Sequence, residues 1–432
     1  MVNAKLDLFK MPPMDTSTSS YHMVTIQPFT TGTTPIDFQV DAQGDFVDLN
    51  RSYFDVELQL SSTDNNNLAR TANDTDTTIA PVNNFAHSIF KQINMRLNGT
   101  LISGQDTKRI WKLLNNNRQA GEMILVPQGT HRYTLKTQKD ALVPFVAQRR
   151  HMLRMKHHLE PLMMGKLLVP GVQFSIQFHM NAPELIFNAV TIQGKIREIK
   201  MNMYLCVVWL NETISRSLMS KMATQKEIVK YPTVRSEIAT QSFRQEERIL
   251  EIRNPFQSRI PNFTMAALVN TAAFNGAYDR DPFCFEKSRV TSLKQFIRGE
   301  EYPYESMDLN YNDGQKDWTG YHRFLQASGC MTKGEPNMVL SKDWGQYYVG
   351  TYVKNGNCTL FSIDNVASGC VDCPYLNSKQ SGDIVYKIFV GTGGLPADTT
   401  VLLLAEFENL IEVYSNQAVL NDIIRGHTPG NA

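Results

Sequence analysis

The chain has 432 residues, more than one hydrophobic core usually serves, so two domains of about 200 residues each are expected. Its 43 basic and 42 acidic residues leave a net charge of +1, which argues against a dedicated nucleic-acid-binding protein because such proteins carry a basic excess. Residues 1–10 lack the apolar core of a secretory signal, and no apolar stretch approaches the roughly 18 residues of a membrane-spanning helix, so we expect a soluble protein made in the cytosol.

Alternating apolar and polar residues predict β-strands in the first half of the chain, at residues 54–60, 174–178 and 199–203. Successive side chains of a strand point to opposite faces, so each run is expected to bury one face. Asn98-Gly99 predicts a type I′ hairpin turn, because both of its central positions need positive φ. The residues expected in the core of this half are Phe54, Val56, Leu58, Leu60, Phe174, Ile176 and Phe178.

Other segments of the first half predict loops and helices. Residues 61–84 are rich in Ser, Thr, Asn and Asp and are expected to form a long exposed loop. The apolar spacing in residues 107–114 favours a short amphipathic helix, and residues 212–228 favour a second one. Tyr231-Pro232 follows as a helix breaker. We therefore expect an N-terminal domain at 1–210, a helical linker at 211–230 and a C-terminal domain at 231–432.

The second half continues the β pattern at residues 385–389 and 401–407, with Leu403, Ala405 and Phe407 expected in its core. Residues 306–320 and 390–400 are expected to be loops. Many strands, long loops and few helices make all-β sandwiches the leading fold class, and two tandem jelly-roll β-sandwiches, a double jelly roll, fit two halves of about 200 residues if the loops are long.

The two halves share an order of features at an offset of about 200 residues. Residues 93–99 and 293–299 are both short apolar runs that reach a glycine, Gly99 and Gly299. Residues 203–210 and 402–410 are apolar runs that close each half. We predict that Gly99 and Gly299 occupy equivalent turns of the two jelly rolls.

Four cysteines raise the question of a metal site: Cys330, Cys358, Cys370 and Cys373. Four thiolates can hold a tetrahedral zinc ion, but such a site normally shows two close pairs of cysteines and only one pair is present here. The alternative, which the spacing favours, is ordinary buried or free thiols.

The densest basic run of the chain holds Arg149, Arg150, Arg154 and Lys156, with three histidines among them. This run is a candidate for contact with DNA phosphates, or for a subunit contact that responds to pH. A solvated loop is the plain alternative, because the rest of the chain is neutral.

Catalytic motifs are missing from the sequence. It holds no Gly-x-Ser-x-Gly elbow, no phosphate-binding Walker loop and no His-Glu-x-x-His zinc motif. Residues 391–394 are glycine-rich but lack the lysine of a phosphate loop. We therefore expect neither an enzyme nor a bound cofactor.

Four stretches, in order along the chain, resemble the double jelly-roll major capsid proteins of the Polinton and adintovirus group and their relatives in animal genomes. They are Asp7-Leu8-Phe9 with Pro12-Pro13, residues 88–99, Ala273-Phe274-Asn275-Gly276-Ala277-Tyr278 with Asp281-Pro282-Phe283, and residues 405–412. The sequence departs from the family at residues 108–111, where a tyrosine-rich helical segment is usual, and at residues 149–158.

The resemblance implies a structural protein of the virion. Homotrimers with six jelly rolls and a pseudo-hexagonal outline would tile an icosahedral shell around a DNA genome. The partners would be neighbouring capsomers, penton or vertex proteins and minor capsid proteins. The resemblance leaves two questions open: whether the protein makes weak contact with the packaged DNA, and whether an internal membrane lines the shell. Assembly would take place in the nucleus or the cytoplasm of the host. A host-retained binding module that forms no shell remains the alternative, and an enzyme on a β-sandwich is a more distant one.

Overall fold

The computed structural model describes residues 16–30, 35–41, 44–62, 79–82, 85–106, 151–155, 159–189, 194–302, 307–309, 318–327, 344, 346–349, 352–355, 358–366 and 376–421. Four antiparallel β-sheets make up most of this part of the chain. None of the helices in the described ranges is both long enough and apolar enough to cross a membrane.

The first half forms two four-stranded sheets. Sheet 1 has the order β1-β10-β3-β7 and sheet 2 has the order β2-β8-β5-β6. The strands of sheet 1 are β1 (Thr18–Ile26), β10 (Gly194–Leu210), β3 (Phe46–Ser62) and β7 (His151–Met155). Those of sheet 2 are β2 (Ile36–Asp41), β8 (Gln173–Met180), β5 (Phe90–Leu97) and β6 (Thr100–Asp106). Strands consecutive in sequence alternate between the two sheets over most of this half, as in a jelly roll.

The second half repeats this arrangement. Sheet 3 has the order β11-β23-β14-β20, with β24 on the far part of β23, and sheet 4 has the order β12-β22-β15-β16, with β17 also on β15. Sheet 3 consists of β11 (Val229–Phe243), β23 (Thr399–Val413), β14 (Phe263–Asn270), β20 (Leu360–Asp364) and β24 (Val419–Asn421). Sheet 4 consists of β12 (Ile249–Arg253), β22 (Ile384–Val390), β15 (Val290–Ile297), β16 (Glu300–Glu301) and β17 (Met307–Asp308). The predicted pair of jelly rolls is confirmed.

Short elements connect these strands. The helices are α1 (Phe85–Ser88), η5 (Glu160–Met163), η6 (Pro183–Leu185), α4 (Glu212–Ala223), α5 (Thr271–Asn275) and α6 (Trp318–Ala327). Three short strand pairs complete the described part: β4 (Ile79–Pro81) with β9 (Phe187–Ala189), β13 (Arg259–Ile260) with β21 (Gln380–Ser381), and β18 (Gln346–Val349) with β19 (Tyr352–Asn355).

The helix expected at residues 212–228 is present but shorter. α4 begins after Asn211, whose side chain accepts a hydrogen bond from the Thr213 backbone N–H, and it ends at Ala223. The prediction of a loop at residues 306–320 is wrong at both ends of that range. Strand β17 starts at Met307, and α6 starts at Trp318 and packs on β20, so tertiary contact creates elements that local composition did not signal. The helix expected at 107–114 lies outside the described residues.

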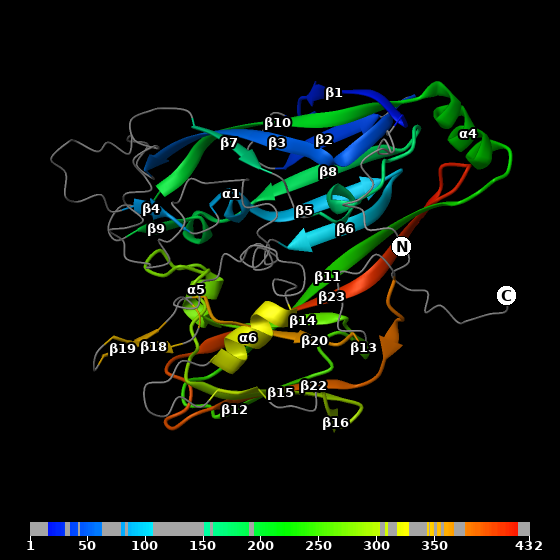
Figure 1. Cartoon of the computed structure of the whole chain (residues 1–432). Helices are drawn as coiled ribbons and strands as arrows, with labels where there is room; N and C mark the ends of the chain where they lie inside the picture. The colour runs from blue at the N-terminus through cyan, green and yellow to red at the C-terminus, as the bar shows by residue number, and fades with distance from the viewer. Residues whose placement is uncertain are drawn as a thin grey trace, which may run out of the picture.

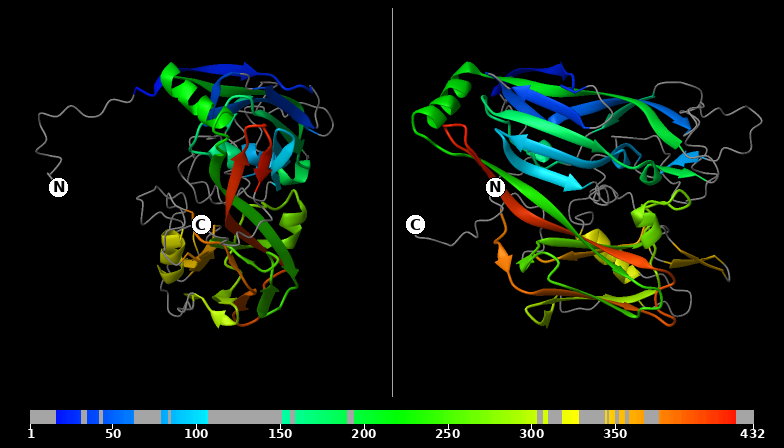
Figure 2. Two further views of the ribbon diagram at one scale, coloured as in Figure 1. Left: turned by 90° about the vertical axis from the view of Figure 1, so that its right-hand side faces the viewer. Right: turned by 180° about the vertical axis from the view of Figure 1, so that it is seen from behind.

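The four sheets are stacked as layers. Figure 1 shows sheet 1 at the top, then sheet 2, sheet 3 and sheet 4, with β11 and β23 running obliquely from the lower half toward the upper one. The reverse view in Figure 2 shows the same two strands reaching the hairpin beside α4. Sheet 3 is therefore an inner layer, whereas sheets 1 and 4 each have an outward face.

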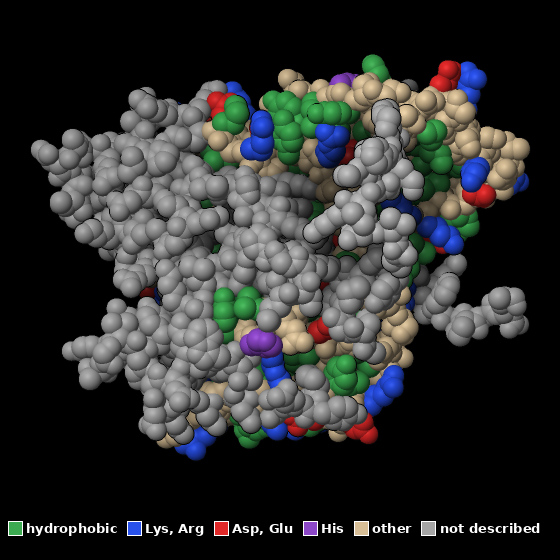
Figure 3. All heavy atoms as spheres, viewed as in Figure 1, with side chains coloured by type: hydrophobic (Ala, Val, Ile, Leu, Met, Phe, Trp, Pro, Cys, Tyr) green, Lys and Arg blue, Asp and Glu red, His purple; other side chains and the backbone are tan. Residues whose placement is uncertain are grey.

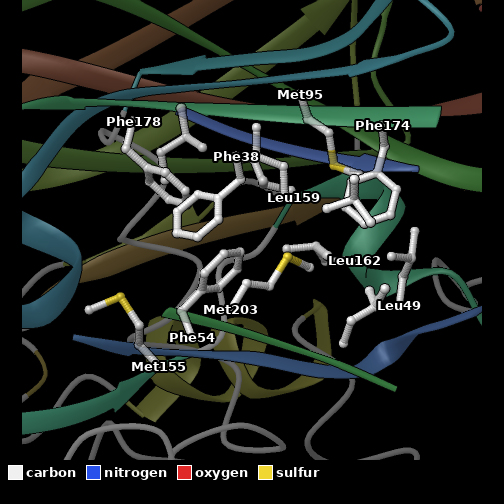
Figure 4. Close-up of a cluster of buried hydrophobic side chains, with 14 of the residues drawn as sticks. Phe38, Leu49, Phe54, Met95, Met155, Leu159, Leu162, Phe174, Phe178 and Met203 are labelled. Atoms are coloured by element: carbon white, nitrogen blue, oxygen red, sulfur yellow. The ribbon is translucent and has the colours of Figure 1, made fainter. Parts of the chain in front are cut away.

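Aromatic rings fill the space between sheets 1 and 2. Phe54 of β3 packs edge-on against Phe178 of β8 and Phe38 of β2, with ring centroids 5.3 and 5.7 Å apart (Figure 4). The side chains predicted for this core are confirmed as buried at Phe54, Val56, Leu58, Phe174, Ile176 and Phe178. The side chain of Leu60 lies outside the described part.

The second core differs from the simple alternating pattern. In β23 every side chain from Val401 to Glu406 is buried, and β14 is buried from Phe263 to Val269, because sheet 3 is covered on both faces. Leu403 and Ala405 are buried as expected. Phe407 is only partly buried, contrary to expectation, because it lies where the strand leaves this core, with its ring 5.0 Å from the Arg259 guanidinium.

Candidate functional site

The described residues do not gather three or more His, Cys, Asp or Glu side chains in a way that could hold a metal ion. The features that distinguish this part of the molecule are extended: a junction that joins the two jelly rolls, and the outward face of sheet 1. Both are candidates for a role in assembly rather than in catalysis.

The junction is built by strands of the second half that enter the core of the first half. Tyr231 of β11, Ile411 and Val413 of β23, and Val419 of β24 belong to the hydrophobic cluster that includes Phe54 and Phe178. Tyr231 and Ile411 lie opposite each other in the β11–β23 pairing, so the two strands enter together. In the other direction, Val82 of the first half packs in the core of the second half. The two cores are thus interlocked, and packing crosses the boundary proposed at residue 231.

Hydrogen bonds of the Tyr231 hydroxyl fix this strand to the first half. Its Oη donates to the Leu167 carbonyl at 3.1 Å and accepts from the Val169 N–H at 3.0 Å. The tyrosine is 1% exposed, and burial raises the pKa of Tyr231 to about 12 because the phenolate would lose its hydration. Lys166 adds a hydrogen bond from its Nζ to the Lys230 carbonyl at 3.0 Å.

The hairpin between β23 and β24 meets the turns of sheet 2. Asn98 donates from Nδ2 to the Gln417 carbonyl at 2.7 Å, and Thr100 donates from Oγ1 to the Val419 carbonyl at 3.2 Å. Asn421 donates to the Ile102 carbonyl at 3.1 Å. Each bond joins a side-chain donor to a backbone carbonyl 319 residues away in the sequence, and together they hold the two halves in one relative position.

A buried polar group lies at the centre of the junction. Asn409 of β23 donates from Nδ2 to Glu160 Oε2 at 3.4 Å and to Asn421 Oδ1 at 2.9 Å. Glu160 and Asn409 are 4% and 2% exposed. A buried polar network of this kind favours one relative position of its elements, because any other position would leave these groups without partners.

The two predicted glycine turns have corresponding places in the strand orders. Gly99 follows β5 and precedes β6 in sheet 2, and Gly299 follows β15 and precedes β16 in sheet 4. The hairpin predicted at Asn98-Gly99 is confirmed, with φ of 44° and 81°. Arg298 and Gly299 adopt the same conformation, with φ of 54° and 87°. Superposition of the two halves remains the measurement of their equivalence.

Of the predicted basic run, the structure describes Arg154, whereas Arg149, Arg150 and Lys156 lie outside the described residues. Arg154 of β7 forms a bidentate ion pair with Asp55, at 2.9 and 3.1 Å, and the carboxylate raises the pKa of Arg154. Its guanidinium lies 4.3 Å from the centre of the Tyr53 ring. Arg154 therefore has an acidic partner within its own sheet, and its contact with DNA or with another subunit stays a prediction.

Of the four predicted cysteines, Cys358 is described and is buried, whereas Cys330, Cys370 and Cys373 lie outside the described residues. The backbone of Cys358 forms a parallel β-bridge with Phe285, which places Cys284 nearby. Burial raises the pKa of the Cys284 thiol well above its usual value, so this group stays protonated. Cys284 was not among the cysteines singled out from the sequence, because 74 positions separate it from Cys358 and only the fold brings the two close together.

The outward face of sheet 1 was missed by the sequence analysis. Tyr53 of β3 stacks on Tyr204 of β10, with ring centroids 5.0 Å apart, and the Arg51 guanidinium lies 3.9 Å from the centre of the Tyr21 ring. Met152 of β7 is 70% exposed on the same face. Tyrosine, methionine and arginine are enriched where proteins meet other proteins. The sequence pattern could have indicated this face, because Tyr53 and Asp55 alternate with the buried Phe54 and Val56 and must therefore point to the opposite side of the strand.

Comparison with known proteins supports the fold. No protein-family model matches the chain, and no curated protein matches it in sequence. Among solved structures, it is similar to the PBCV-1 virus capsid (TM-score 0.58, 8% identity, 96% of this chain and 100% of that chain). It is also similar to the mavirus major capsid protein, with a TM-score of 0.54 and 10% identity over 97% of this chain and 93% of that chain. The Sputnik virophage structure matches with a TM-score of 0.55 and 9% identity over 100% of this chain and 94% of that chain. The chain has the double jelly-roll fold of these proteins over essentially its full length.

Proposed function

We propose that this chain is the major capsid protein of a DNA virus, and that three copies form a homotrimer with a pseudo-hexagonal outline. Trimers of this kind would tile an icosahedral shell around the genome. The observation that carries the proposal is the presence of two jelly rolls with the same strand order in one chain. A threefold assembly of a duplicated unit presents six similar sides, and six sides allow close tiling of a surface.

The junction supports the proposal on physical grounds. A tile has a defined outline only if its two halves keep a fixed angle. Here Tyr231, Ile411 and Val413 bury their side chains in the core of the other half, and Asn98 and Asn421 add polar contacts to it. A protein with two independent binding modules would instead show a small, polar contact between domains.

The remaining parts of the proposal follow from the shell. The partners would be neighbouring capsomers, penton or vertex proteins and minor capsid proteins, and the location would be the virion. The role is structural and needs neither catalysis nor a cofactor. Contact with packaged DNA through Arg149, Arg150, Arg154 and Lys156 is the weakest part, because Arg154 already pairs with Asp55.

Mass measurement and electron microscopy of the full chain test the proposal. We expect a species of three times the chain mass, with averages that show a sixfold-like outline, and closed particles at higher protein concentration. A folded protein that stays monomeric across salt, pH and concentration would contradict the shell function and favour the host-retained binding module. Trimers whose averages lack the six-sided outline would contradict the proposed tile.

A further inference from the structure

Strand β1 is an edge strand with an unusual surface. Among the described residues it pairs only with β10, so one row of its backbone N–H and C=O groups faces outward. Eight of its nine residues, from Thr18 to Thr25, are exposed. An open edge of this length is a template for another strand.

The edge strands of the four main sheets differ in charge. Proteins commonly protect open edges with charged residues or proline, because these oppose pairing with a foreign strand. In the described part of the chain, every other edge strand of these sheets except the three-residue β24 carries at least one such charge: Arg154 in β7, Asp37 in β2, Asp106 in β6, Lys230 in β11, Asp364 in β20, Glu251 in β12, Glu300 in β16 and Asp308 in β17. β1, with the sequence TSSYHMVTI, has no Asp, Glu, Lys, Arg or Pro. β24 lacks these residues too but is three residues long, so β1 is the one long edge without them among the described strands of the four main sheets.

Apolar side chains are exposed on both faces of β1. Tyr21 and Met23 lie on the outward face and are 54% and 39% exposed, while Val24 on the other face is 37% exposed. Trp209 of β10 is 52% exposed, and its ring lies 4.9 Å from that of His22. Figure 3 shows hydrophobic side chains gathered at the upper edge of the molecule, over β1 and β10. An apolar cluster beside an unprotected edge is typical of a protein contact.

The outward face of sheet 4 provides a contrast within the same chain. Its edge strand β12 also exposes an aliphatic side chain, Ile249, which is 56% exposed. Glu251 in the same strand forms ion pairs with Arg253 and with Lys387 of β22. Paired charges of this kind keep a sheet face hydrated. Sheet 1 also carries ion pairs on its outward face, Arg154 with Asp55 and Lys200 with Glu198, but none of these residues belongs to β1, whereas in sheet 4 the ion-paired Glu251 lies in the edge strand itself.

We propose that β1 of one copy pairs in antiparallel fashion with β1 of a second copy. The second copy is the occupant that the charges favour, because every other main-sheet edge described in this chain, apart from the three-residue β24, would place a charged side chain against the uncharged strand. When the same strand of two copies pairs in antiparallel fashion, a twofold axis relates the two copies, so the contact is isologous and closed. The contact also brings no two like-charged Lys, Arg, Asp or Glu side chains together, because β1 has none. The net charge of +1 leaves little repulsion between copies.

This inference rests on the proposed shell function, in which the twofold contact joins two neighbouring trimers. It adds a specific strand and a symmetry to that function. The trimer itself is held by other surfaces, because a twofold contact cannot close a threefold ring.

The test compares Met23→Lys with Ile249→Lys in the full chain. Both side chains are exposed on an edge strand, so both variants should fold and should form trimers if the parent does. A lysine introduced into the paired strand of each copy should raise the concentration needed for association of trimers by about tenfold or more, because two extra positive charges are added to one uncharged contact, whereas Ile249→Lys should assemble like the parent. Assembly of Met23→Lys at the parent concentration would overturn the inference and leave the shell function standing.

Hydrogen exchange of residues 18–26 gives a second and independent measure. Exchange in β1 should slow as the parent chain associates, while exchange in β12 should stay unchanged. If the parent forms no trimers or particles, the shell proposal fails, but slowing of β1 exchange with concentration still supports the β1 contact. Exchange in β1 that does not change between dilute and associated protein would overturn that contact, since the edge would then be free or covered within one copy.

Discussion

Removal of a single hydroxyl at Tyr231 tests whether the two jelly rolls are held as one unit. Tyr231→Phe keeps the ring in the core of the first half but leaves the Leu167 carbonyl and the Val169 N–H without their partner. Each hydrogen bond contributes about 0.5–1.5 kcal/mol, so we expect the free energy of unfolding to fall by about 1–3 kcal/mol.

Urea unfolding followed by circular dichroism gives this change, after reversibility has been checked. Hydrogen exchange of the peptide that contains Val169 gives a local measure, and it should become faster because its amide loses its acceptor. Tyr21→Phe is the matched control, since Tyr21 is 54% exposed and its loss should change stability by less than about 0.5 kcal/mol. Equal stability of Tyr231→Phe and Tyr21→Phe, with unchanged exchange at Val169, would refute the reasoning.

Three further changes have defined outcomes. Phe174→Ala removes a ring that is 1% exposed and should cost about 3–5 kcal/mol in urea unfolding, and a near-neutral value would contradict the register of β8. Gly320→Ala should cost about 1–3 kcal/mol in the same assay, because its Cβ would lie 2.3 Å from Trp344 Cη2, whereas Gly165→Ala, with open space around its Cβ, should be near neutral. Burial holds the pKa of Tyr231 at about 12 in the folded state against about 10 in the unfolded state, so the unfolded chain loses its proton first and stability should fall as pH rises from 10 to 12. This loss should be smaller by about 2–3 kcal/mol in Tyr231→Phe, and identical alkaline profiles would contradict the assignment.

Side-chain alternation was enough to predict the class of fold and much of the first core. Phe54, Val56 and Leu58 alternate with polar residues and point into the core while the polar residues point to the outward face of the sheet, so the sequence period of two carries the information. The Asn98-Gly99 turn was predictable for a local reason as well, since few residue pairs accept positive φ at both positions. The order of these local signals in each half, together with the family resemblance, indicated two jelly rolls.

Features that depend on contact between distant segments could not be predicted in this way. Phe407 belongs to an apolar run and was expected in the core, but its strand leaves the sandwich at that point, and only the path of β23 decides this. Tyr231 follows a predicted helix and precedes a proline, and nothing local shows that its hydroxyl meets Leu167 and Val169. α6 was missed because its apolar face is defined by the strand that it covers.

The sequence by itself therefore determined several strands and the tight turn, because each depends on side-chain preferences within a few residues. The sequence also shows that residues 18–26 carry no charge, but this could not indicate a contact surface until the structure showed that β1 is an edge strand. The tertiary structure alone decided which strands are edges, which sheet is covered on both faces and how the two cores interlock. These properties arise from pairing between segments hundreds of residues apart, and pairing at that distance leaves no periodic pattern in the chain.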